Sequence, residues 1–455
     1  MDNKLQKKYG LLTAIAMVIG IVIGSGVFFK AEKVLTKTGG NLPLGILAWV
    51  IGGIIMIACA YTFAVMATKY EYVNGVVDYA EAALGKKYAY YVGWFMALIY
   101  YPTLTSVLAW VSARYTCVLF GFSITGGECM TIACLYLVAS FTMNALSPVI
   151  AGKFQVSTTV IKLIPLLLMA IVGTIVGIRS GMIVDNFTTV VNEVDTFSAL
   201  FTAVVATAFA YEGWVIATSI NAELKDAKKN LPKALVGGTF AIMLIYILYY
   251  VGLAGAVTNE TMMAGGEAGA KLAFENILST AGGTLIFVFV IISCLGTLNG
   301  LMLGCTRGIY SLSARNVGPK PEMFNQVDKA TNMPTNSSIF GLLLCGVWLL
   351  FFYGANLAES SWFGFFSFDS SELPIVTIYA MYIPVFFMLM KKEKDLNTFK
   401  RFIMPALAIL GCLFMILAAC VSHKMAVVAY LIIFAVVMVV GALFSKPKTS
   451  SISKD

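Results

Sequence analysis

The sequence predicts an all-α polytopic membrane protein with twelve spanning helices, and three observations support that fold class. Of the 455 residues, 59% are hydrophobic and only 12% are charged, whereas soluble proteins average about 45–50% and about 25%. Apolar runs long enough to cross a bilayer, which takes about 20 residues, recur along the chain. The basic residues lie mainly in the short loops between these runs. The chain is therefore expected to form a single membrane domain over residues 1–455.

The predicted spans follow one another through mostly short loops. In chain order they cover residues 11–29, 43–68, 88–118, 128–146, 154–178, 195–221, 233–257, 284–313, 338–354, 362–390, 402–421 and 424–444. Pro102 predicts a kink in the third span. The loop 258–283 is expected to contain a small surface helix. The loop 314–337, which has three prolines, is expected to connect or gate the spans.

The distribution of Lys and Arg predicts the orientation, because loops that stay in the cytoplasm are enriched in both residues. If the two termini are cytoplasmic, the loops on that side hold 22 basic residues and the opposite loops hold six. The other three, Arg114, Lys162 and Arg307, lie inside predicted spans. We therefore expect a multi-pass protein of the cell membrane with both termini in the cytoplasm.

Composition excludes several other classes of protein. The chain has 31 Lys and Arg against 23 Asp and Glu. This excess does not indicate nucleic-acid binding, because most of the basic residues lie in the loops between the predicted spans. The nine cysteines lie in or at the ends of apolar runs, as buried free thiols do. His423 is the only histidine and no CxxC pair occurs, so neither a metal nor a cofactor is expected. No cleavage site follows the first apolar run, so no cleavable signal peptide is expected.

The first and sixth predicted spans are both interrupted near their centres. The first contains Gly24-Ser25-Gly26 within "MVIGIVIGSGVFF", and the sixth contains Glu212-Gly213 within "TAFAYEGW". Interruptions at corresponding places of two repeats indicate a transporter binding site. Close packing of helices is the alternative explanation for the glycines, since Gly20-x-x-x-Gly24 fits a packing motif.

Backbone chemistry suggests what such interruptions bind. Lipid cannot hydrogen-bond a free N–H or C=O group, so a broken helix must line a cavity or lie within protein. The N–H groups that begin a half-helix attract a carboxylate. The carbonyls that end the other half-helix accept hydrogen bonds from an ammonium group. A zwitterionic α-amino acid offers both groups.

Three motifs give the chain a resemblance to a known family. "IGSGVFF" (Ile23 to Phe29), "FAYEGW" followed by "AELKDAKKNLPKAL" (to Leu235), and "TTVIKLIPL" (Thr158 to Leu166) resemble motifs of the amino acid–polyamine–organocation superfamily. The chain is most similar to bacterial relatives of the L-amino-acid transporter-type exchangers. The resemblance covers essentially the whole chain. It implies a leucine-transporter-type fold, with repeats of five helices at 11–178 and, inverted, at 195–390, and two extra helices at 402–444.

The resemblance also implies a substrate site and a transport mode, namely exchange of amino acids by alternating access. The substrate carboxylate would bind Ser25 and Gly26, and Phe209 would close over the substrate as an inner or outer lid. The ammonium group would bind carbonyls near Val22, Ile23, Phe209 and Ala210.

Lys162 is the clearest charged residue inside a predicted span, where a lysine costs about 2.5–3.5 kcal/mol on insertion scales. In related transporters a lysine at this position replaces a sodium ion and reaches spans 1 and 8. The resemblance therefore implies sodium-independent transport. Tyr246 matches a family tyrosine close to this site, and Thr297 in "SCLGTLNG" is a polar candidate from span 8. A structural ion pair for Lys162, and helix–helix hydrogen bonding for Thr297, are the alternatives.

Glu212, beside Gly213, permits several roles. It is expected to pair with Lys162, to carry a proton, to meet a cationic substrate, or to bind freed N–H groups as a structural partner. The sequence alone leaves these roles open.

The leading functional hypothesis is sodium-independent exchange of small neutral L-amino acids of the alanine, serine, threonine and cysteine type. The alternative is proton-coupled transport or exchange of cationic amino acids or amines, with Glu212 as counter-charge. A channel lacks support because no filter motif repeats, and an enzyme lacks support because no constellation such as HExxH occurs. The loop 119–127 has no cysteine, so no disulfide-linked heavy chain is expected. The expected partners are the amino acid and the bilayer, with no nucleic acid, in a monomer or homodimer.

Overall fold

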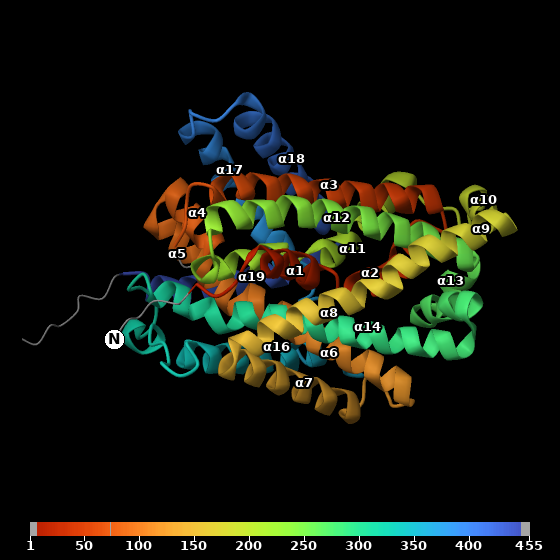
Figure 1. Ribbon diagram of the computed structural model, residues 1–455, viewed down its shortest axis with the longest axis horizontal. Coiled ribbons are helices and arrows are strands. Elements are labelled where there is room, and N and C mark those ends of the chain that lie inside the picture. The colour runs from red at the N-terminus through yellow and green to blue at the C-terminus, as the bar shows by residue number, and fades with distance from the viewer. Residues whose placement is uncertain (1–6, 73, 447–455) are drawn as a thin grey trace, which may run out of the picture.

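The computed structural model describes residues 7–72 and 74–446, apart from the side chains of Ser25, Phe29, Glu267 and Ala268. Within these residues, twelve helical stretches are long and apolar enough to cross a membrane. Most of the long helices run along the longest axis of the molecule (Figure 1). The predicted all-α fold with twelve membrane-spanning segments is confirmed.

The helices occupy most of the described chain. In order they are α1 (Leu11–Val22), α2 (Ser25–Lys37), α3 (Leu42–Ala67), α4 (Gly75–Leu84), α5 (Lys86–Phe95), α6 (Tyr101–Phe120), α7 (Gly127–Leu146), α8 (Pro148–Leu168), α9 (Thr174–Ser180), α10 (Met182–Thr188), α11 (Thr196–Tyr211), α12 (Ala227–Ala256), α13 (Asn259–Gly265), α14 (Glu267–Ser313), α15 (Pro321–Phe324), α16 (Thr335–Asn356), α17 (Leu373–Lys392), α18 (Met404–His423) and α19 (Met425–Ala442). Short π-helical turns are η1 (Met96–Tyr100), η2 (Met169–Gly173) and η5 (Phe399–Ile403), and 3₁₀ turns are η3 (Trp214–Glu223) and η4 (Gly364–Phe366).

The tenth span is shorter than predicted, and the prediction that it begins at residue 362 is wrong. Helix α17 begins at Leu373. The run Asp369-Ser-Ser-Glu372 before it is polar, and the Asp369 carboxylate accepts a hydrogen bond from the backbone N–H of Ser371 at 2.7 Å. This local bond competes with helical hydrogen bonding. Pro374 then stands in the first turn of α17, where a missing N–H costs nothing.

Other helices extend beyond their predicted ranges: α12 begins at Ala227 rather than at 233, and α14 begins at Glu267 rather than at 284. Helix α8 begins at Pro148 rather than at 154, because the Ser147 side chain accepts a hydrogen bond from the N–H of Ile150 at 3.3 Å and so caps the helix. The predicted small surface helix in loop 258–283 is α13. It is followed directly by α14, whose helical path is interrupted at Ser279 by a positive φ of 71°.

The two ends of the described chain meet at one end of the bundle, which we call the terminal face. Lys7 pairs with Glu71 there, and Lys446 lines the same cleft as Glu71. The opposite end, which we call the far face, carries the end of α2 at Lys37. The residues between the two faces hold the interrupted helices (Figure 1).

Buried aromatic rings pack the centre of the bundle. Trp49 of α3 packs edge-on against Tyr211 and Tyr246, with both pairs of ring centroids 5.5 Å apart. Tyr211 also donates a hydrogen bond to the carbonyl of Trp49 at 2.9 Å. Edge-to-face pairs of this kind add about 0.5–1.5 kcal/mol beyond the burial of their area. They fix α3, α11 and α12 against one another behind the site described next.

Candidate functional site

The first helical interruption separates α1 from α2. Helix α1 ends at Val22, Ile23 has φ −72° and ψ 98°, and α2 begins at Ser25 after a non-helical Gly24. The backbone therefore leaves the helical hydrogen-bonding pattern at two consecutive residues. The carbonyls of the last turn of α1 must find other donors, because lipid supplies none.

Lys162 of α8 supplies donors for this interruption. Its fully buried ammonium Nζ lies 2.6 Å from the carbonyl oxygens of Gly20 and Ile23 and 3.0 Å from the hydroxyl of Thr297 on α14. Three acceptors match the three donors of an ammonium group. The Thr297 hydroxyl also lies 3.1 Å from each of the same carbonyls. Lys162 therefore joins α8, the end of α1 and α14.

The second interruption separates α11 from η3. Helix α11 ends at Tyr211, Glu212 is extended with φ −83° and ψ 162°, and Gly213 has a positive φ of 105°. Side chains other than that of glycine are strained at such a φ. A Cβ atom on Gly213 would also come within 2.7 Å of the Ile21 side chain of α1. Glycine is required here by both conformation and space.

Tyr246 of α12 bridges the two interruptions. Its hydroxyl lies 3.0 Å from the carbonyl oxygens of both Val22 and Ala210. The two carbonyls belong to the last turns of α1 and α11. The donor groups of Lys162, Thr297 and Tyr246 therefore converge on the two broken backbones.

Glycines allow these segments to approach one another closely. A Cβ atom on Gly26 would lie 2.6 Å from the Cα of Ala210, and one on Gly24 would lie 2.5 Å from the Thr297 hydroxyl. Packing thus explains part of the glycine pattern. The same approach brings the start of α2 and the end of α11 to one place. Ser25 begins α2, and its side chain lies outside the described part of the structure.

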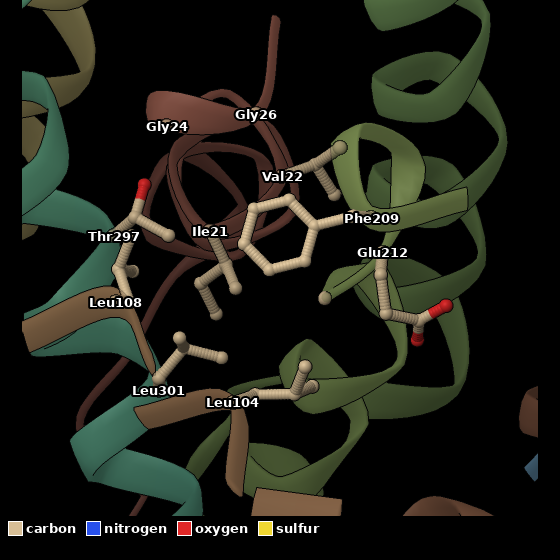
Figure 2. Close-up of a pocket in the computed structure, with 11 residues that line it drawn as sticks. Ile21, Val22, Gly24, Gly26, Leu104, Leu108, Phe209, Glu212, Thr297 and Leu301 are labelled. Atoms are coloured by element: carbon tan, nitrogen blue, oxygen red, sulfur yellow. The ribbon is translucent and has the colours of Figure 1, made fainter. Parts of the chain in front are cut away.

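A cavity of about 30 Å³ lies between the interruptions, which is room for water-sized groups. Figure 2 shows the Phe209 ring extending from α11 into this space, with leucines of other helices across from it. The cavity is lined by residues of α1, α2, α6, α11 and α14 and of the two interruptions, namely Ile21, Val22, Gly24, Gly26, Leu104, Leu108, Phe209, Glu212, Gly213, Thr297 and Leu301. This volume is smaller than an amino acid, so the walls of the cavity must separate to admit one.

Four of the lining residues are absent from the residues that the sequence singled out, namely Ile21 of α1 and three leucines. Leu104 and Leu108 come from α6, and Leu301 comes from α14. The spacing of four places Leu104 and Leu108 on one face of α6. That spacing was the available signal, but leucines at such spacing are common in every membrane helix. Their position beside the interruptions follows only from how the helices pack.

Glu212 points away from the centre of the cavity (Figure 2). Its carboxylate accepts a hydrogen bond from the hydroxyl of Tyr100 in η1, and the residue is buried. The predicted alternative in which Glu212 pairs with Lys162 is wrong for this conformation. Lys162 is turned to Gly20, Ile23 and Thr297, whose oxygens satisfy it. Tyr100 donates instead to one of the two carboxylate oxygens of Glu212.

A buried ion pair lies between the cavity and the far face. Lys30 Nζ of α2 lies 2.6 Å from Glu372 Oε1, and His423 Nε2 lies 2.9 Å from Glu372 Oε2. The same Lys30 Nζ lies 5.3 Å from the centroid of the Phe209 ring, within range of a cation–π interaction. Burial alone would raise the pKa of Glu372, but Lys30 and then His423 hold it well below its usual range. We call Phe209, Lys30, Glu372 and His423 the far closure.

A second buried ion pair lies on the side of the terminal face. Arg307 Nε of α14 donates to Glu223 Oε1 at 2.5 Å, and both side chains are almost inaccessible to solvent. The N–H groups of Lys8 and Tyr9 donate to the Glu223 carbonyl at 2.8 and 3.0 Å, so the N-terminal segment lies across the end of η3. We call Glu223, Arg307 and Tyr9 the terminal closure. Buried ion pairs therefore flank the cavity on the sides of both faces.

Comparison with known proteins identifies the fold and the family. The model of the amino acid permease family matches residues 9–443, nearly the whole chain. The chain belongs to the amino acid permease family. It is accordingly a membrane transporter rather than an enzyme, and the resemblance to the amino acid–polyamine–organocation superfamily is confirmed.

Individual relatives of this permease are exchangers and transporters of amino acids. The serine/threonine exchanger SteT of Bacillus subtilis is 29% identical over 93% of either chain. The b(0,+)-type amino acid transporter 1 of Mus musculus is 26% identical over 95% of this permease and 86% of the relative. The cystine/glutamate transporter of Homo sapiens is 23% identical over 73% of this permease and 65% of the relative.

Proposed function

We propose that this permease exchanges small neutral L-amino acids, such as alanine, serine, threonine and cysteine, by alternating access and without sodium. The observation that carries the proposal is the composition of the cavity wall. The side opposite the two interruptions consists of Leu104, Leu108 and Leu301, and these offer no charge to a substrate side chain. The backbone ends on the other side suit a carboxylate and an ammonium group.

In this proposal each interruption binds the substrate group that the sequence analysis assigned to it. The substrate carboxylate binds the start of α2 at Ser25 and Gly26, and its ammonium group binds carbonyls of Val22, Ile23, Phe209 and Ala210. A carbonyl oxygen has two lone pairs, so Val22, which already accepts from Tyr246, retains capacity for the substrate. Phe209 acts as the lid towards the far face.

Independence from sodium is supported by Lys162. Its ammonium is surrounded by two backbone carbonyls and a hydroxyl, which are oxygen ligands that a sodium ion would also use. A fixed positive charge at this point repels a second cation, since little solvent screens charges in the interior. In this proposal Lys162, Tyr246 and Thr297 hold the interrupted helices without any ion.

The orientation and the mode of transport complete the proposal. The terminal face is cytoplasmic, as the ratio of 22 basic loop residues to six indicates. Exchange, rather than one-way uptake, agrees with SteT, which is a serine/threonine exchanger and is related over 93% of this chain. The transporter works in the cell membrane, without a disulfide-linked heavy chain, through two inverted repeats at 11–178 and 195–390.

A second candidate is transport of a cationic amino acid or an amine, and the buried Glu212 favours it. This carboxylate belongs to the cavity lining, although it is turned towards Tyr100. Rotation of its side chain towards the cavity would present a negative charge to a cationic substrate or carry a proton. Its orientation away from the cavity centre (Figure 2) favours the neutral substrates.

Counterflow in proteoliposomes tests both candidates. Vesicles holding the purified permease are loaded with unlabelled amino acids, and one labelled amino acid or amine is added outside, with sodium or with choline. Uptake of labelled alanine or serine only into loaded vesicles, unchanged by sodium, supports the proposal. Preference for lysine, arginine or an amine supports the second candidate, and accumulation that requires sodium contradicts both.

A further inference from the structure

A large polar cleft opens at the terminal face, outside the transport cavity. Its volume is about 1200 Å³, comparable with sites that bind small organic ligands. It is lined from α4, from the starts of α5 and α12, and from the residues that follow α3, α14 and α19. None of these residues belongs to the substrate site proposed above.

The acidic residues of the cleft already have basic partners. Glu71 pairs with Lys7 at 2.7 Å. Asp78 and Glu81 both pair with Arg315, the second at 3.1 Å. Burial raises the pKa of Asp78, and Arg315 opposes that shift.

Four lysines of the cleft remain without such partners. Lys86, Lys87, Lys228 and Lys446 are exposed, and none of them forms an ion pair with the residues that the structure describes. They come from the starts of α5 and α12 and from the residues after α19. The cleft therefore carries an excess of positive charge that converges from three separate parts of the chain.

The cleft lies at the depth of the lipid headgroups. α3 ends at Ala67, α14 at Ser313 and α19 at Ala442, whereas α5 begins at Lys86 and α12 at Ala227. All five helices belong to membrane-spanning stretches, and their ends at this face mark where hydrocarbon gives way to headgroups. A basic pocket between helices at this depth matches the chemistry of an anionic headgroup.

We propose that this cleft binds the phosphate of an anionic phospholipid headgroup in the leaflet at the terminal face. The lysine ammonium groups contact the phosphate oxygens, and Tyr70, Tyr72 and Tyr90 border the glycerol region as interfacial tyrosines do. The occupant lies beside Arg315, whose partner Asp78 accepts a hydrogen bond from Asn221 of η3 at 3.4 Å. The site thus adjoins the element that carries the terminal closure.

Lipid binding to matched variants tests the proposal. The triple variant Lys86→Gln, Lys87→Gln, Lys228→Gln removes three cleft lysines. Its control, Lys329→Gln, Lys394→Gln, Lys400→Gln, removes three exposed lysines that do not line the cleft and changes the net charge equally. Native mass spectrometry of the full chain in detergent measures the binding of phosphatidylglycerol and of phosphatidylcholine with the same acyl chains. Thermal unfolding establishes that each variant is folded.

We expect the wild type and the control to bind phosphatidylglycerol about tenfold or more tightly than the triple variant does, since each lysine contributes to headgroup attraction. The wild type, the control and the triple variant should bind phosphatidylcholine with equal affinity. Equal phosphatidylglycerol binding by the triple variant and the control would overturn the site. A parallel titration with inorganic phosphate identifies the source of the phosphate. If it displaces phosphatidylglycerol at millimolar concentration, the cleft is a site for free anions and the lipid assignment is wrong.

Discussion

The ammonium group of Lys162 lies 2.6 Å from the carbonyl oxygen of Ile23, although 139 residues separate the two in the chain. Ile23 is the point where the first spanning helix loses its regular geometry. The hydrogen bond between them therefore offsets both the cost of burying the lysine and the cost of leaving the carbonyl without a helical partner. A charged hydrogen bond contributes about 1.5–3 kcal/mol. A buried carbonyl left unpaired would cost about 1–3 kcal/mol, and a buried ammonium left unpaired would cost more.

Replacing Lys162 tests this relationship. Lys162→Ala leaves the carbonyls of Gly20 and Ile23 with one donor, the Thr297 hydroxyl, so we expect exchange to fall at least about tenfold. Counterflow in sodium and in choline measures the effect. Lys153→Ala, at an exposed position of the same helix, is the control. Wild-type exchange with unchanged ion dependence in Lys162→Ala would refute the role of Lys162.

Leu104, Leu108 and Leu301, which we call the leucine wall, predict how the preference for substrate size changes when the wall is cut back. Leu104→Ala removes part of the wall opposite the interruptions, so larger neutral amino acids such as leucine should gain relative to alanine. A single methylene group more or less in an apolar pocket gives about 10–200-fold discrimination. Competition against labelled alanine measures the ratio.

Leu135→Ala is the matched control for the leucine wall, because Leu135 is exposed on α7 and lies outside the cavity lining. An unchanged preference in Leu104→Ala, with the variant folded and active, would mean that the substrate side chain lies elsewhere.

The far closure predicts how readily a reagent added at the far face reaches the cavity. Glu372→Gln weakens the contact to Lys30, so a cysteine placed in the cavity by Leu108→Cys should react faster with an impermeant maleimide added from the far face. The rate in Glu372→Gln without Leu108→Cys gives the background from native thiols. Glu359→Gln, at an exposed acid, serves as the charge control.

The same assay carries a pH prediction for Glu372. A carboxylate with a lowered pKa keeps its stabilising charge above that pKa and loses it only as the pH falls through it. Because the pKa of Glu372 is lowered, labelling of the Leu108→Cys protein should stay slow from about pH 8 down to about pH 5. A sharp rise in labelling within this range would exclude the ion pair as the element that shuts the far side.

The terminal closure predicts a stability effect. Glu223→Gln leaves the buried guanidinium of Arg307 without its anion, and breaking such a pair costs about 3–5 kcal/mol. Thermal unfolding in detergent should therefore show a marked fall in midpoint. The double variant Glu223→Gln, Arg307→Met removes both charges and should recover part of that loss. If the double variant is no more stable than Glu223→Gln, the pair does not act as a unit.

Local properties of the sequence were sufficient to predict the spans and the interruptions. Hydropathy within about 20 residues decides whether a segment enters lipid, and this holds for eleven of the spans, although the eighth begins at Gly269 rather than at 284. The tenth was misplaced because apolar aromatics at 362–366 precede the polar residues that keep α17 from starting. The second interruption was predictable as well, because Glu212 and Gly213, the residues that disfavour the helix, lie at the interruption itself.

Only the tertiary structure decided which distant residues complete the site and close it. Lys30 and Glu372 are 342 residues apart, and Glu223 and Arg307 are 84 apart. No local pattern links the members of such pairs, because the residues around each side chain do not indicate which distant charge it meets. Leu104, Leu108 and Leu301 differ from other membrane leucines only in what packs beside them. The sequence by itself determined where the backbone breaks, and the packing of the helices determined what surrounds each break.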